Sequence, residues 1–174
     1  MPKCGGITIS RLVDECCPGL IVKDYNSFFK IPRQERKRAI QGSLRDPALA
    51  PPDKLIYGHF FPVKYLGGPG VTPAGGFRLV TILRDPIERL ISHYKYWSAL
   101  DFPDHYLWRR MRENRWGFEE FAFCEEMRNF YLQYFEGLSL EQFSFIGTLD
   151  NLPFSARECL RCLGIELPES FAMP

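Results

Sequence analysis

One apolar run constrains the fold of this chain more than any other stretch of its sequence. Residues Phe77 to Leu83 read FRLVTIL, which is typical of a strand in a parallel sheet that is covered on both faces. Arg84-Asp85-Pro86 ends this run, and apolar residues then recur with helical spacing, so Pro86 falls in the first turn of a helix. A strand, a tight turn and a helix in this order predict an α/β fold, in which ligands bind at the carboxyl ends of the strands.

Weaker patterns along the rest of the chain fit the same fold class. Short apolar segments predict strands over residues 20–22, 54–57 and 143–147. Helical spacing predicts helices over residues 7–17, 106–113, 118–136 and 154–163, while the GGPGVTPAGG stretch is typical of a loop. The sequence has no internal repeat and no interior linker, so we expect one domain over residues 1–174.

The charge of the chain is almost balanced. Lys and Arg together number 22 and Asp and Glu 21, which gives a formal net charge of +1. This charge creates no overall field that would attract nucleic acid or an anionic membrane, so any anion must bind locally. No stretch approaches the roughly 18 apolar residues of a membrane span, and the first residues are too polar for a secretory signal. We therefore expect no nucleic-acid partner, no membrane contact within this chain and a cytoplasmic location.

The six cysteines do not form a metal-binding pattern. The only CxxC sequence, from Cys159 to Cys162, lacks the second pair of Cys or His residues that would complete a zinc site. It also falls in a predicted helix, where packing is a more common role for cysteine than redox chemistry. We expect reduced thiols and no metal.

The amino-terminal stretch MPKCGGITIS has the composition of an anion-binding turn. Gly5 and Gly6 let backbone N–H groups approach an anion, and the helix that follows offers its amino terminus. Lys3 adds a positive charge, while Thr8 and Ser10 add hydroxyl donors. A Lys-x-Gly-Gly sequence is also common in turns that bind nothing. Taken alone, this stretch supports a phosphate-binding turn and a plain turn equally.

The stretch LRDPIERLISHY offers a second place for a phosphate. Arg84 follows the strong strand and Ser92 lies two turns into the next helix, so the two side chains can hold one phosphate from two sides. Asp85 is expected to cap the helix, and Arg89 to pair with Glu88 or Asp85 on the surface. The alternative interpretation is a helix start with a solvated charged face.

Both stretches resemble motifs of the sulfotransferases that use 3′-phosphoadenosine 5′-phosphosulfate (PAPS). The first is similar to the family's Pro-Lys-x-Gly-Gly-Thr-Ser loop. The second matches the family's Arg-Asp-Pro-x-x-Arg-x-x-Ser-x-Tyr motif from Arg84 to Tyr94 without a gap. IYGHFFP resembles the Gly-His-Phe segment of carbohydrate sulfotransferases that modify glycosaminoglycans, and FSFIGTLDNL resembles their later Val-Gly-x-x-Glu segment. The resemblance spans nearly the whole chain.

The resemblance implies a fold, a reaction and a set of site residues. The fold is a three-layer α/β/α arrangement with a mainly parallel central sheet, like that of P-loop kinases. The reaction moves a sulfuryl group from PAPS to a hydroxyl without a metal, by in-line displacement. Residues that contact the 5′-phosphosulfate are then Lys3, Gly5, Gly6 and Thr8, and residues that hold the 3′-phosphate are Arg84 and Ser92. His59 matches the catalytic base, a role that a neutral histidine can fill.

Three features depart from the family pattern. The family's loop follows a core strand, whereas only Met1 precedes Pro2 here, Ile7 replaces a hydroxyl residue, and Asp150 stands where Glu is common. We expect a fragment, a mispredicted start or a shortened relative; a fragment of a membrane-anchored enzyme would belong in the Golgi lumen. A catalytically inactive relative that binds nucleotide or a partner stays open as an alternative. A P-loop kinase is disfavoured, because its GxxxxGK[ST] loop does not occur at Lys3.

The resemblance implies a saccharide acceptor, on which the residues themselves say little. The basic cluster of Arg33, Arg36, Lys37 and Arg38 is compatible with an acidic polysaccharide, but such runs are more often solvated faces. Aromatic residues that are able to stack on sugars are more often core residues; they include Tyr96, Trp97 and Trp116. His93 and His105 are interpreted as surface or packing residues.

Overall fold

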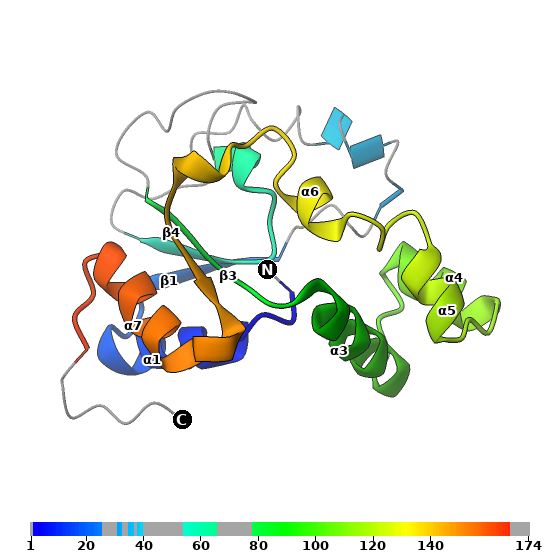
Figure 1. Ribbon diagram of the computed structural model, residues 1–174, viewed down its shortest axis with the longest axis horizontal. Helices are drawn as coiled ribbons and strands as arrows, with labels where there is room; N and C mark the ends of the chain where they lie inside the picture. Colours follow the sequence, from blue (N-terminus) through cyan, green and yellow to red (C-terminus); the bar gives the residue numbers. More distant parts are fainter. Residues whose placement is uncertain are drawn as a thin grey trace.

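The computed structural model describes residues 2–25, 31–32, 35–36, 38–39, 54–65 and 78–167 of the chain (Figure 1). Its strands are β1 (Ile21–Asp24), β2 (Leu55–Gly58), β3 (Leu79–Leu83) and β4 (Phe143–Thr148). Its α-helices are α1 (Gly6–Cys16), α3 (Pro86–Ala99), α4 (Tyr106–Glu113), α5 (Phe118–Phe123), α6 (Phe130–Tyr134) and α7 (Leu152–Cys162). Short 3₁₀ helices are η2 (Pro62–Tyr65), η3 (Leu140–Gln142) and η4 (Leu149–Asn151). The protein is α/β, as predicted; Phe77 and the GGPGVTPAGG stretch lie outside the described residues.

The described strands form two parallel pairs, β1 with β2 and β3 with β4. Ile21 lies opposite Leu55 in the first pair, and Leu83 lies opposite Thr148 in the second. Each pair joins strands that are far apart in the sequence, because a parallel connection needs a long crossover. Within the described ranges, no backbone pairing joins one pair to the other. The parallel pairing is confirmed, whereas a single central sheet stays a prediction.

Two clusters of buried side chains hold these elements together. The aliphatic core packs α1 and α7 against the strands, and its buried members are Ile9, Leu12, Val13, Ile82, Ala156, Leu160 and Ile165. The aromatic core joins α3, α4, α5 and α6, and its buried members are Phe61, Trp97, Leu107, Met111, Phe121, Met127, Phe130 and Tyr134. Figure 1 shows α1 and α7 on one side of β3 and the helices of the aromatic core on the other. The carboxyl end of β3 therefore lies between two cores of different chemistry.

The turn between β3 and α3 has the predicted structure. One carboxylate oxygen of Asp85 accepts hydrogen bonds from the N–H groups of Ile87 and Glu88, at 3.0 and 2.9 Å. Pro86 occupies the first turn of α3, where its missing N–H group costs nothing. This cap and the apolar strand before it fix where Arg84 leaves the strand.

The prediction of one helix over residues 118–136 is wrong. Helix α5 ends at Phe123, Cys124 is extended, and Asn129 adopts a left-handed conformation with φ of 51° before α6 begins. The side-chain amide of Gln133 donates to the carbonyl oxygens of Glu125 and Arg128. These hydrogen bonds satisfy carbonyl groups that a continuous helix would have satisfied internally, so they stabilise the interruption.

Two arginines expected at the surface are buried. Arg89 is 2% exposed; its guanidinium lies 4.0 Å from the centre of the Phe130 ring and 3.3 Å from Nδ1 of His93, so the predicted surface pairing is wrong. Arg36 is 4% exposed and donates to the carbonyl of Ile31 and to the side chain of Gln133. In the same basic cluster Arg38 is exposed, while Arg33 and Lys37 lie outside the described residues.

The six cysteines are free thiols, and Cys159 is buried while Cys162 is half-buried. Burial raises the pKa of the Cys159 thiol to about 12, which leaves it protonated and suits the predicted packing role. The described part of the chain contains no cluster of His, Cys, Asp or Glu that is able to hold a metal ion. It also contains no helix with the length and apolar character needed to cross a bilayer.

Candidate functional site

The carboxyl ends of β2 and β3 meet at the amino-terminal turn (Figure 1). His59 directly follows β2 and Arg84 directly follows β3. Lys3, in the turn before α1, shares one cleft with Arg84 and a second cavity with His59. Two strand ends and one loop thus bring together residues that are widely separated in the sequence, at the edge where α/β proteins bind ligands.

The first of these spaces, named the donor cleft after the donor that the sequence resemblance implies, has a volume of about 500 Å³. It is lined by Lys3, Arg84, Glu88, Ile91, Ser92, Lys95 and Tyr96. The cleft joins Lys3 to both residues that sequence analysis assigned to a second phosphate. Lys95 and Tyr96 were missed there as cleft residues, although they lie three and four positions after Ser92, on the same face of α3.

The turn before α1 contains left-handed residues and no side-chain cap. Gly5 has a φ of 78° and begins α1 without a side-chain cap, and the first turn carries no acidic residue. Lys3 also has a left-handed conformation, with φ of 62°, which it shares with Arg115 and Asn129 among the non-glycine residues described. A Cβ atom at Gly6 would lie 2.5 Å from the hydroxyl oxygen of Tyr57, so a larger residue there would force the tyrosine side chain to move. Thr8 lies half-buried in the same helical turn and lines neither cavity that holds Lys3.

Hydrogen bonds to the backbone fix the position of Arg84, while its side chain pairs with an exposed carboxylate. Its N–H donates to the Tyr131 hydroxyl at 3.2 Å, and that hydroxyl donates to the Arg84 carbonyl at 2.5 Å. Its guanidinium donates to one carboxylate oxygen of Glu88 at 3.2 Å, and the Glu88 side chain is 58% exposed. A ligand anion would replace this exposed carboxylate at modest cost.

Positive charges dominate the place where the cleft and the cavity meet. The Lys3 ammonium lies 3.9 Å from the centre of the Tyr96 ring. Partial burial and the neighbouring charge of Arg84 lower the pKa of Lys3. Since two cations repel each other here, an anion bound between them would relieve the repulsion and be held by both.

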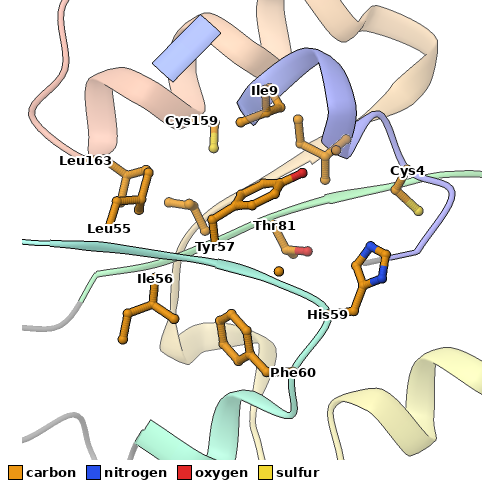
Figure 2. Close-up of a pocket in the computed structure, with 14 residues that line it drawn as sticks. Cys4, Ile9, Leu55, Ile56, Tyr57, His59, Phe60, Thr81, Cys159 and Leu163 are labelled. Carbon is orange, nitrogen blue, oxygen red and sulfur yellow. The ribbon is translucent and has the colours of Figure 1, made fainter. Parts of the chain in front are cut away.

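His59 lies at the end of β2 and faces the turn that holds Cys4 (Figure 2). Its ring meets the ring of Tyr25 edge-on, with 5.2 Å between their centres. Burial and nearby positive charges, including that of Lys3, lower the pKa of His59 to about 3. The ring is therefore neutral at pH 7 and able to accept a proton, and a bound anion that offsets the cations would raise its basicity.

The second space, the aromatic cavity, has a volume of about 340 Å³. It is lined by Pro2, Lys3, Tyr25, His59, His93, Tyr96, Trp97, Phe102, His105, Leu107, Met127 and Phe130. His93 is 5% exposed and packs against Trp97, as predicted, but both His93 and His105 also border this cavity. Trp97 is a core residue, whereas Tyr96 separates the cavity from the donor cleft by lining both.

A smaller cavity of about 110 Å³ separates the two strand pairs. Its lining includes Tyr57 of β2, Thr81 of β3, Ile9 of α1 and Cys159 of α7, and Figure 2 shows the Tyr57 ring between the pairs. Burial raises the pKa of Tyr57 to about 12, so its hydroxyl stays protonated. Its lining is mainly apolar and, in the described part of the chain, includes His59 but no Lys or Arg.

The structure thus brings Lys3, Arg84, Ser92 and His59 together around two adjoining spaces. Gly5 and Gly6 shape the turn that carries Lys3, and Thr8 lies behind them. Tyr131 was missed because its partner, Arg84, is remote in the sequence. No model of a protein family matches this chain, and neither a curated protein nor a solved structure matches it.

Proposed function

We propose that this chain is a PAPS-dependent sulfotransferase, which moves a sulfuryl group from PAPS to a hydroxyl of an acceptor. The observation that carries the proposal is the convergence of Lys3, Arg84 and Ser92 on one cleft. A donor with phosphate groups at both ends needs two anion sites within one cleft. Lys3 beside an uncapped helix start and Arg84 beside Ser92 are such a pair.

The same residues account for the chemistry. Bound PAPS would supply the sulfuryl group and a phosphate that leaves with the bridging oxygen. Lys3 stabilises the negative charge that develops on that oxygen, and Arg84 and Ser92 hold the opposite phosphate. His59 accepts the proton of the acceptor hydroxyl and shares the second space with Lys3. The cations of the protein provide the charge stabilisation, so the proposed step uses no metal.

The finer architecture belongs to the same proposal. The two parallel strand pairs, with α1 and α7 packed on one side, are compatible with a three-layer α/β/α sheet of the sulfotransferase type. A cytoplasmic location stays a prediction.

Calorimetric titration with 3′,5′-adenosine bisphosphate, without added metal, tests the donor site. We expect micromolar binding by the wild type and about 30-fold weaker binding by Arg84→Ala, because a charge-assisted hydrogen bond contributes about 2 kcal/mol. Arg78→Ala is the matched control, since Arg78 donates to the carbonyl of Cys162 outside the cleft. A folded wild-type chain that does not bind the bisphosphate would overturn the proposal.

One observation favours a second candidate, a catalytically inactive nucleotide-binding relative. The two strand pairs flanking the turn are not joined by backbone pairing in the described residues, and the cavity between them leaves the turn with less support. Single-turnover assays with radiolabelled PAPS separate the two functions. Bisphosphate binding without any sulfuryl transfer, to water or to an acceptor panel, would favour this second candidate.

A further inference from the structure

The cavity beside His59 is walled mainly by aromatic rings. Tyr25 and Tyr96 form its outer part, and Phe102, Trp97 and Phe130 continue inward. Tyr25 is 47% exposed and Tyr96 39% exposed, whereas Trp97 and Phe130 are buried. Such walls offer broad apolar contact to a flat ring.

The floor of the cavity belongs to the aromatic core. Trp97, Leu107, Met127 and Phe130 are 6, 1, 5 and 4% exposed, and all four are members of that core. Among the described residues, this core therefore closes the inner end of the cavity. A polymer would place only its terminal unit there, whereas a small one-ring or two-ring molecule would fit as a whole.

The charges of the cavity do not suit an acidic acceptor. Among the described lining residues, Lys3 is the one side chain with a permanent positive charge, and no Asp or Glu lines the space. His59 and His93 are neutral, because burial lowers the pKa values of both. An acidic polysaccharide needs several cations to offset its desolvation, and under the proposed function Lys3 is already engaged by the donor.

We propose that the acceptor is an uncharged phenol, in place of the saccharide that the resemblance implies. This rests on the proposed function. The ring lies among Tyr25, Tyr96 and Phe102, with its hydroxyl at His59 and Lys3. The bond between sulfur and the phosphate oxygen of PAPS breaks, a bond between sulfur and the phenol oxygen forms, and the phenolic proton passes to His59. The products are an aryl sulfate and 3′,5′-adenosine bisphosphate.

Acceptor competition tests the proposal on the wild-type chain. With saturating PAPS, we expect kcat/KM for naphthol to exceed that for N-acetylglucosamine and for desulfated chondroitin by at least about tenfold, the value of one good aromatic contact. A preference for either saccharide would overturn the phenol proposal and leave the sulfotransferase proposal standing. Failure to bind 3′,5′-adenosine bisphosphate would overturn both.

Variants locate the phenol within the cavity. We expect Phe102→Ala to raise KM for naphthol about tenfold while the Kd of the bisphosphate stays unchanged, because Phe102 does not line the donor cleft. Phe123→Ala is the matched control, since Phe123 is 68% exposed and lines neither space. Titration of naphthol into bisphosphate-loaded protein, followed by tryptophan fluorescence, gives a readout independent of turnover. An unchanged KM and an unchanged naphthol Kd in Phe102→Ala would contradict the assignment.

Discussion

The donor cleft and the aromatic cavity share Lys3 and Tyr96 but have opposite chemistry. The cleft is lined by charged side chains: Arg84 just before α3, and Glu88 and Lys95 on α3. The cavity gathers rings and neutral histidines and reaches into the aromatic core. Under the proposed function, donor affinity would depend on electrostatics, and acceptor choice on shape and apolar contact. Each space is therefore open to change with little effect on the other, except at Lys3 and Tyr96.

Lys3→Ala has the largest expected effect, because Lys3 lines both spaces. Loss of one preorganised charge at the leaving oxygen lowers single-turnover transfer about a hundredfold to a thousandfold. Lys23→Ala, on the exposed side of β1, serves as control. Transfer at the wild-type rate in a folded Lys3→Ala chain would contradict the proposed role of Lys3 at the leaving oxygen.

Acid is expected to lower the free energy of unfolding through His59, which lines the aromatic cavity. The pKa of His59 is about 3 in the folded chain and near 6.5 when unfolded, so the unfolded chain binds more protons between these values. Stability is full above pH 6.5 and falls as the pH drops; at pH 5 the loss is about 2 kcal/mol from His59. Thermal unfolding at pH 7.5 and pH 5 measures this loss.

His59→Gln removes the titrating group, so its Tm should fall less between the two pH values than that of the wild type. Tyr25→Phe keeps the ring that packs on His59 and should retain the full decrease. An equal decrease in the wild type and His59→Gln would show that the acid sensitivity lies elsewhere.

Tyr131→Phe should weaken bisphosphate binding in the donor cleft and lower stability, with a smaller effect than the changes above. The lost hydroxyl bridges the N–H and carbonyl groups of Arg84, so the free energy of unfolding should fall by about 1 kcal/mol. Bisphosphate affinity should fall with it, since the strand end would be less fixed. Tyr94→Phe, whose hydroxyl makes a long 3.5 Å contact with the Trp116 carbonyl, should change Tm and Kd less.

Glu88→Gln has the smallest expected effect and the opposite sign. It frees Arg84 from an exposed ion pair of about 0.5 kcal/mol, so the bisphosphate should bind roughly twofold more tightly. Glu158→Gln breaks the surface pair with Arg161, away from the cleft, and should leave the Kd unchanged. Weaker binding by Glu88→Gln would mean that Glu88 positions Arg84 for the ligand instead of competing with it.

Local signals predicted much of the fold. The apolar strand before Arg84, the Asp85 cap and helix α4 over Tyr106–Glu113 lie where the sequence placed them, because capping and periodicity depend on near neighbours. The interruption after Phe123 was missed, because it depends on side-chain hydrogen bonds from Gln133.

The candidate site was predictable only in part. Lys3, Arg84, Ser92 and His59 were selected by motif, but no sequence pattern indicates how their surroundings change their chemistry. Arg89 shows the limit: its neighbours along the helix are charged, yet it is buried against Phe130. Burial depends on which distant element covers a residue, and no local pattern carries that information.

The sequence by itself determined the α/β class, the strand and turn before α3, and the residue types available for binding an anion. Only the tertiary structure decided that Lys3 lies beside Arg84 on one side and His59 on the other, and that the space next to His59 is aromatic. The physical reason is the distance along the sequence over which each kind of interaction acts. Caps and periodic burial act over a few residues, whereas a cavity is formed by side chains from remote elements that meet only after the chain has packed.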